Sequence, residues 1–220
     1  MPQNASLWKK ALNTQIGNFD RLGTFDVDAP IPADVKPIKT KFVFKLKTKT
    51  GNDGNLEIDK YKIRLVAKGY SQIKGETFWD TFAPVTHSAT TKAAMAICLD
   101  SGWEACGMDT TSAFINSTIK FDAFVEMPPG YAYKGKTIMK LNKTLEGTRQ
   151  GAHDWYQEQD ELIQNGPWEK YIVKSTVDPC LYVYKNEGTQ ALISVHSDAR
   201  DATGMAGTPT CRHAVQYYSK

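Results

Sequence analysis

The chain has 220 residues, of which 41% are hydrophobic and 23% are charged, and this composition excludes collagen-like, low-complexity and wholly disordered proteins. No stretch reaches the ~18 to 20 apolar residues that a membrane span needs, and the N-terminus lacks the apolar run of a secretory signal. We therefore expect an intracellular globular protein with one main core and no membrane partner.

The net charge of +3 hides a strongly basic segment. Between Lys36 and Lys74 there are eleven Lys or Arg residues against three acids, a local charge of +8, which leaves −5 for the rest of the chain. A concentrated positive field of this kind suits a polyanion or a triphosphate. A solvated Lys-rich sheet face explains the same charges, and composition does not choose between the two.

Residues 1–35 are predicted to form a peripheral segment. A short helical stretch is expected around Leu7 to Leu12. Prolines then block regular structure, because proline lacks an amide N–H and has a fixed backbone dihedral. We assign no function to this segment.

Two runs in which apolar and basic residues alternate, 41–47 and 60–65, flank a Gly- and Asn-rich turn cluster at 51–55. Alternation with a period of two is typical of β-strands, so these runs predict a cationic β-hairpin. Like charges that oppose each other on neighbouring strands cost up to about 1 kcal/mol per pair. Such a hairpin is therefore either fully solvated or stabilised by a bound anion.

The second half of the chain combines predicted helices and strands. A helix capped by Ser88 is expected over 88–100, with a small-residue apolar face that predicts burial under a sheet. Another helix is expected over 149–164, ended by Asn165-Gly166-Pro167. Further strands are expected before Asp109 and over 124–127, 138–141, 178–184 and 191–195.

Two acids, Asp109 and Asp198, each follow a predicted strand of this mixed sheet. An acid at the end of a buried strand is costly unless it is hydrogen-bonded or binds a cation. If the strands are neighbours, the two carboxylates would meet and bind Mg²⁺ together with nucleotide phosphates. Acids at strand ends are common, and Asp109 also fits a helix N-cap, so spacing alone leaves this assignment open.

At these residues the sequence resembles the reverse transcriptases of copia-type LTR retrotransposons. The resemblance covers roughly residues 40–204 and rests on ordered blocks, which are KFVFKLK, DKYKIRLVAKGYSQIKGETFWDTFAPV, WEACGMDTTSAFIN, VEMPPGY, KLNKTLEGTRQGAHDWY and DPCLYVY. Six blocks in the expected order make the resemblance highly specific.

The resemblance implies an α+β fold with polymerase fingers and a partial palm, in which a thumb and an RNase H region are absent. It divides the chain into a lead-in segment (1–37), fingers and palm (38–204) and a divergent tail (205–220). It also implies an RNA or DNA template-primer and a dNTP as partners, Mg²⁺ as cofactor, and a polyprotein with integrase upstream and RNase H downstream. The family works in cytoplasmic particles.

Site residues follow from the resemblance position by position. Asp109 and Asp198 correspond to catalytic metal ligands, and Phe114 to the bulky residue that stacks on the sugar and excludes a ribose 2′-OH. The basic pair Lys62 and Arg64 would face the incoming triphosphate. In addition, Gln150 would lie beside the nucleotide and the template.

Three departures from the family pattern predict impaired catalysis. The Tyr-Val-Asp-Asp block of the family falls on residues 196–199, so the second catalytic Asp is Ala199. Arg200 and Asp201 occupy positions of an apolar returning strand, which predicts a broken hairpin. Glu146 replaces a usual Tyr and adds negative charge near the substrate pocket. The alternatives are a non-catalytic relic and a host-recruited domain that binds nucleic acid or serves as an interaction scaffold.

Overall fold

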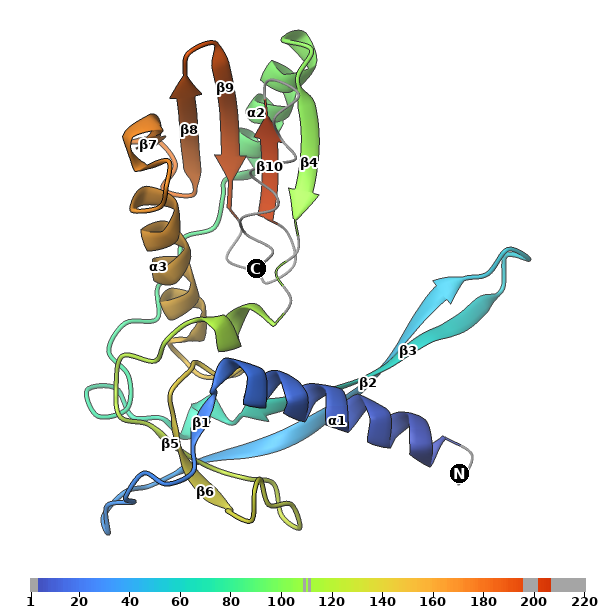
Figure 1. Cartoon of the computed structure of the whole chain (residues 1–220), viewed down its shortest axis with the longest axis vertical. Coiled ribbons are helices and arrows are strands. Elements are labelled where there is room, and N and C mark those ends of the chain that lie inside the picture. Colours follow the sequence, from blue (N-terminus) through green and yellow to red (C-terminus); the bar gives the residue numbers. More distant parts are fainter. Residues whose placement is uncertain (1–3, 109, 111, 196–201, 207–220) are drawn as a thin grey trace. The chain divides into compact units, whose positions relative to one another are not determined.

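A computed structural model gives the fold of the chain and describes residues 4–108, 110, 112–195 and 202–206 (Figure 1). The chain divides into two compact units. The first comprises Met1–Thr81 and Phe114–Asp154, and the second Phe82–Ala113 and Trp155–Lys220. Each unit has its own five-stranded sheet, so the expectation of a single main core is wrong.

The first unit builds a mixed sheet with strand order β1-β6-β5-β2-β3. Strands β2 and β5 pair in parallel, and the other neighbours are antiparallel. Its elements are α1 (Ala5–Leu22), β1 (Phe25–Asp26), β2 (Ile38–Thr50), β3 (Leu56–Ala67), the 3₁₀ turns η1 (Gly69–Ser71) and η2 (Ala113–Asn116), β5 (Phe124–Glu126) and β6 (Ile138–Leu141).

Helix α1 is longer and more deeply integrated than the short peripheral helix that we expected. It has 18 residues and ends at Gly23, whose left-handed conformation (φ 59°) is readily adopted by glycine. Its residue Phe19 is 1% exposed, and Trp8 makes edge contacts with two aromatic rings of the hairpin. The helix therefore contributes Phe19 to the first unit's core and packs Trp8 against the hairpin, whereas many of its other residues are exposed.

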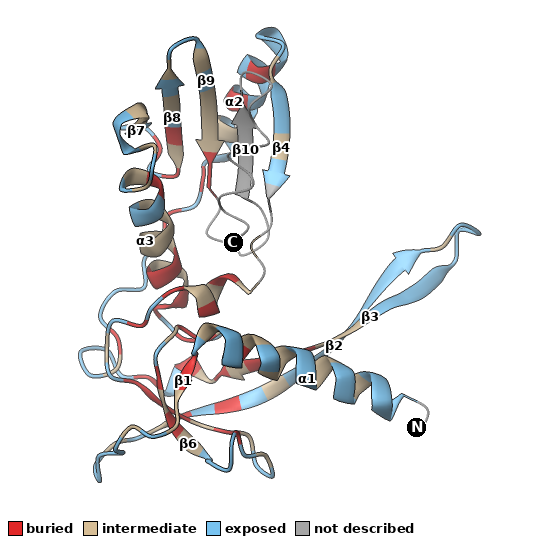
Figure 2. Ribbon diagram, in the orientation of Figure 1, coloured by how far each residue is buried: buried red, intermediate tan, exposed pale blue. Residues whose placement is uncertain are grey.

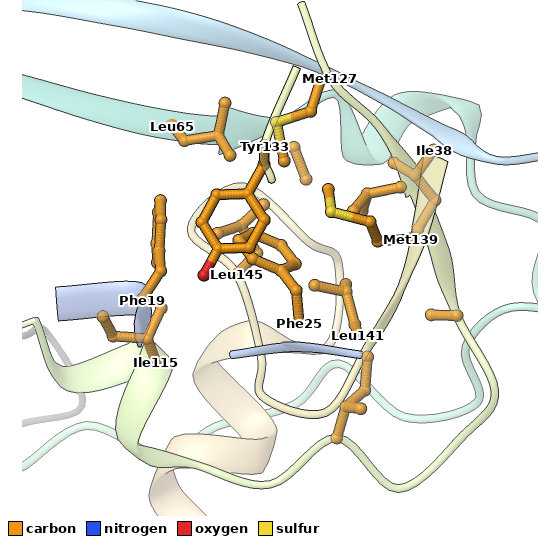
Figure 3. Packing of buried hydrophobic residues seen from close by; sticks show 14 residues of the cluster. Phe19, Phe25, Ile38, Leu65, Ile115, Met127, Tyr133, Met139, Leu141 and Leu145 are labelled. Atoms are coloured by element: carbon orange, nitrogen blue, oxygen red, sulfur yellow. The ribbon is translucent and has the colours of Figure 1, made fainter. Parts of the chain in front are cut away.

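Buried hydrophobic side chains of the first unit form one continuous core (Figure 3). The ring of Phe25 makes edge contacts with Phe19 and Tyr133 at centroid distances of 5.1 and 5.2 Å. The Tyr133 hydroxyl donates a 2.6 Å hydrogen bond to Asp20, which ties the loop after β5 to the end of α1. The core holds Phe19, Phe25, Ile38, Leu65, Ala67, Ile115, Ile119, Ala123, Val125, Met127, Tyr133, Met139, Leu141 and Leu145.

The predicted cationic hairpin is confirmed as strands β2 and β3. They pair antiparallel, with Lys45 opposite Lys62 and Lys47 opposite Lys60, and a register shift follows Lys47. Near the sheet the hairpin is partly buried, whereas most of its far end is exposed (Figure 2). The like-charged pairs are thus tolerated on a ribbon that is largely open to solvent.

The second unit builds an entirely antiparallel sheet with strand order β4-β10-β9-β8-β7. Helix α3 begins in the first unit and continues into the second. The elements are α2 (Ser88–Asp100), β4 (Glu104–Met108), α3 (Gly151–Gln164), the 3₁₀ turn η3 (Glu169–Tyr171), β7 (Ile172–Lys174), β8 (Leu181–Asn186), β9 (Thr189–Ser194) and β10 (Ala202–Ala206).

For helix α2 the predicted burial is confirmed in part, and the predicted cap is wrong. The small residues Ala94 and Cys98 are buried and pack with Trp103 and Leu192, whereas most of the helix is exposed, with Leu99 at 84%. Ser88 is the first helical residue and not the cap, and the N-cap position is held by His87 without a side-chain cap hydrogen bond.

The returning strand that Arg200 and Asp201 were expected to break is present as β10. It begins at Ala202, directly after these charges, and pairs with both β9 and β4. A strand needs only its backbone hydrogen bonds to neighbouring strands, so charged residues that precede it do not prevent pairing. Arg200 and Asp201 themselves lie outside the described residues.

Within the described part of the chain, no helix is both long and apolar enough to cross a membrane.

Candidate functional site

Three strand ends meet at one edge of the second unit's sheet (Figure 1). Strand β4 ends at Met108, which pairs with Ala202 at the start of β10, and Thr203 pairs with Ser194 at the end of β9. The residue after Met108 is Asp109, and the connection from β9 to β10 contains Asp198 and Ala199. These three residues lie outside the described part of the chain, so their assignment stays a prediction, but the residues that flank them share this edge.

Buried hydrogen bonds hold the end of β9. The backbone N–H of Val195 donates to the carbonyl of Cys180 at 2.9 Å, and the Thr86 hydroxyl donates to the carbonyl of Val195 at 2.7 Å. The Ser194 hydroxyl donates to that of Thr86 at 3.2 Å. The chain is therefore firmly positioned at the last described residue before the predicted catalytic motif.

Asp178, in the turn before β8, stabilises the region around the end of β9. Its carboxylate is buried and accepts hydrogen bonds from the backbone N–H groups of His87 and Cys180, both at 2.9 Å. Burial alone would raise the pKa of Asp178, but hydrogen bonds from the Thr90 side chain and these two N–H groups outweigh it and leave the pKa below its ordinary value. Asp178 thus caps the N-terminus of α2, although it lies 91 residues from His87 in the sequence.

In the first unit, the predicted triphosphate ligands Lys62 and Arg64 lie on β3. The Nε atom of Arg64 is 3.0 Å from Oε1 of Glu146, and the two form an ion pair. Burial lowers the pKa of Lys62, and the neighbouring cations Arg64 and Lys47 lower it further. Cations are therefore concentrated at this part of the hairpin, and one of them already has a carboxylate partner.

The loop that carries Glu146 is attached to the end of β3 through its backbone. Ala67 N–H donates to the carbonyl of Glu146 at 2.7 Å, and Gly69 N–H to that of Gly147 at 3.2 Å. Gly147 has φ +87°, and a Cβ there would lie 2.3 Å from the carbonyl oxygen of Ala67. Only glycine fits at this contact.

Gln150 is fully buried at the start of α3 and is held by Gln72. Nε2 of Gln72 donates to Oε1 of Gln150 at 3.0 Å and to the carbonyl of Thr77 at 3.2 Å, while Oε1 of Gln72 accepts from Arg149 N–H at 2.8 Å. Among the described residues, Nε2 of Gln150 finds no hydrogen-bond partner. Gln72 was not predicted as a partner, because nothing in the sequence around it marks a residue 78 positions away.

Phe114 is half-buried in η2 and lies near Gly151, the first residue of α3. A Cβ on Gly151 would lie 3.4 Å from a ring carbon of Phe114, so the two residues are in close contact. The four predicted nucleotide ligands Lys62, Arg64, Phe114 and Gln150 thus all belong to the first unit. The residues that flank the predicted metal ligands belong to the second.

Comparison with known proteins decides the family. Residues 23–204 match the family model described as reverse transcriptase (RNA-dependent DNA polymerase). The chain belongs to this family. The predicted resemblance is thereby confirmed, and the mixed helix-and-sheet fold is consistent with a reverse transcriptase domain.

Curated relatives are plant retrotransposon polyproteins. The chain is 32% identical to the Pol polyproteins from transposons RE1 and RE2 of Arabidopsis thaliana, over 94% and 97% of its length. It is 31% identical to the Pol polyprotein from transposon TNT 1-94 of Nicotiana tabacum, over 79% of its length. The matches span 12% to 14% of these relatives. This reverse transcriptase domain therefore corresponds to one part of a copia-type Pol polyprotein.

Proposed function

We propose that the domain descends from a template-directed DNA polymerase in which the second unit is the palm and the first unit provides the fingers. The observation that carries this proposal is the edge where Met108, Ser194 and Ala202 meet. The segments that contain Asp109 and Asp198 both start from this edge, which supports the proposal that their carboxylates share a metal. The RNA or DNA template-primer and the dNTP would be the substrates.

The proposed metal centre consists of Asp109 and Asp198. Mg²⁺ prefers oxygen ligands and is held by one or two carboxylates together with substrate phosphates, so this donor pair suits it. When bound, Mg²⁺ neutralises charge on the attacking and leaving oxygens of phosphoryl transfer. The described residues contain no cluster of three His, Cys, Asp or Glu side chains that would hold a metal.

The proposed nucleotide ligands come from the first unit. Lys62 and Arg64 would attract the triphosphate by charge, and Phe114 would pack against the sugar. Gln150 would lie beside the nucleotide and template, although its side chain is fully buried here and its amide is held by Gln72, so direct contact would require that side chain to become accessible. In an intact polyprotein, integrase would precede this domain and RNase H would follow it.

Catalysis is proposed to be impaired, because a methyl group at Ala199 supplies no oxygen where the family has its second acid. The test is Mg²⁺-dependent extension of a DNA primer on an RNA template by the native chain, Ala199→Asp and Asp109→Ala. An exposed acid of the same unit, changed in Asp100→Ala, is the matched control. We expect little or no extension by the native chain and a gain in Ala199→Asp.

Extension by the native chain that Asp109→Ala abolishes would overturn the impairment and show that two acids suffice. If Ala199→Asp extends no better than the native chain, the defect does not lie at this position. If Ala199→Asp extends the primer, and adding Asp109→Ala to it reduces extension no more than adding Asp100→Ala does, Asp109 is not a metal ligand.

A second candidate function, nucleic-acid binding without catalysis, is favoured by the basic residues of the hairpin. Phosphate contacts by Lys and Arg make affinity fall steeply with salt and do not require Mg²⁺. Fluorescence anisotropy with labelled single-stranded RNA, in EDTA and at increasing salt, measures this binding. Affinity that survives EDTA and falls with salt would support it, and affinity that requires Mg²⁺ would contradict it.

A further inference from the structure

One face of the β2–β3 hairpin carries a row of cations. Side chains alternate between the two faces of a strand, and the register of the pair brings the basic positions of both strands to the same side. We call this side the basic face, and its members are Lys41, Lys45, Lys47, Lys60, Lys62 and Arg64. Its natural ligand is an anion with several charges.

A carboxylate of the chain itself already binds this face. Oε1 of Glu146 lies 3.0 Å from Nε of Arg64, and the charge of Glu146 also acts on Lys62. Both side chains of the ion pair are partly open to solvent, with 30% of Arg64 and 31% of Glu146 exposed. A ligand from solution can therefore reach the guanidinium group.

The position of Glu146 is set by its backbone and not by the ion pair alone. Its carbonyl accepts the 2.7 Å hydrogen bond from Ala67, and the following Gly147 is packed too tightly against Ala67 to accept a side chain. This attachment holds the carboxylate beside Arg64 at low entropic cost, because the backbone is already ordered.

We propose that the Glu146 carboxylate is an internal competitor that occupies the phosphate-binding position of Arg64. A guanidinium group binds carboxylate and phosphate through the same N–H donors, so Nε–H of Arg64 serves one or the other. A triphosphate that binds through Nε–H must displace Glu146, and one that binds through the other guanidinium N–H groups still meets the negative charge of Glu146. Glu146 thus weakens binding of phosphates at the base of the hairpin and favours ligands of lower negative charge. This inference rests on the proposed nucleotide site.

The test measures binding and needs no catalysis. Inorganic tripolyphosphate and a dNTP are titrated calorimetrically into the full chain and into Glu146→Gln, which keeps the shape of the side chain and removes its charge. Exposed ion pairs contribute up to about 1 kcal/mol, which corresponds to about fivefold in a binding constant. We expect Glu146→Gln to bind both probes about fivefold more tightly than the native chain.

Two further variants isolate the mechanism. Asp122→Asn removes the same charge from the exposed Lys140–Asp122 pair of the same unit, whose N–O distance is 2.6 Å, and should leave the affinity unchanged. In an Arg64→Gln background, the change at Glu146 should raise the affinity less than it does in the native background, because only the general charge effect remains. Circular dichroism spectra would check that each variant is folded.

The outcomes separate this inference from the function on which it rests. If the native chain binds both probes and Glu146→Gln binds no tighter, Glu146 does not compete and the inference fails alone. Equal gains from Glu146→Gln and Asp122→Asn would show a general charge effect and also overturn it. Binding by neither the native chain nor Glu146→Gln would overturn the proposed nucleotide site together with the inference.

Discussion

Replacing Asp178 by Ala should destabilise the second unit strongly. The side chain is 1% exposed, and its carboxylate joins the start of α2 to the turn before β8 through the N–H groups of His87 and Cys180. Leaving a buried donor unpaired costs about 1–3 kcal/mol, and loss of a helix cap about 1 kcal/mol. Because one of the two donors belongs to the helix terminus, these contributions overlap. We expect a loss of about 2–4 kcal/mol in the free energy of unfolding.

The same carboxylate predicts how this loss depends on pH. The pKa of Asp178 is lowered from 3.8 in the folded state, so its charge stabilises the fold above the unfolded pKa, and this contribution disappears as pH falls through the folded pKa. The difference between the native chain and Asp178→Ala should therefore be full at neutral pH and shrink below about pH 4.

Urea denaturation followed by circular dichroism at a series of pH values measures both effects. Glu187→Ala, at an exposed acid in the turn between β8 and β9, is the control and should change little at any pH. A difference below about 0.5 kcal/mol at neutral pH is typical of surface substitutions and would refute the reasoning. A difference that persists unchanged at acidic pH would refute its electrostatic part.

Two other substitutions test packing and buried hydrogen bonding. Gly147→Ala should destabilise the first unit by more than about 2 kcal/mol, because its φ is +87° and the new Cβ would lie 2.3 Å from the Ala67 carbonyl oxygen. Gly54 has a similar φ of +80°, but a Cβ there would have no atom within 4 Å, so Gly54→Ala carries the cost of the backbone conformation without a clash. Comparing the thermal unfolding of Gly147→Ala and Gly54→Ala therefore gives the part of the destabilisation that is due to the clash. Tyr182→Phe removes a 2.6 Å hydrogen bond to Asp160 and should cost about 1–2 kcal/mol in urea denaturation, whereas an unchanged midpoint would contradict this role.

Local patterns predicted the elements whose periodicity was clear. The alternation of lysines with apolar residues led directly to the hairpin, because a strand sends successive side chains to opposite faces. In α1 the residues Trp8, Leu12, Ile16 and Phe19 also share one helix face, but only its first turns were predicted. The proline-rich stretch that follows favoured a peripheral interpretation, whereas packing of Phe19 into the core stabilises the whole helix.

Side-chain partners distant in sequence could not be predicted in the same way. Gln72 and Gln150 are 78 residues apart, and Thr86 is 109 residues from Val195. Polar residues of these types occur throughout the chain, and no spacing rule links one to another. Their pairing depends on which strands become neighbours.

The sequence by itself determined the family, the concentration of positive charge and most of the strands and turns, since each is encoded in residues that are close together along the chain. Only the tertiary structure decided that α1 belongs to the core and that Glu146 meets Arg64 across 82 residues. It also decided that the ends of β4 and β9 and the start of β10 share one edge. Such contacts arise when chain topology brings remote segments together, and their energies depend on burial and geometry that local sequence does not contain.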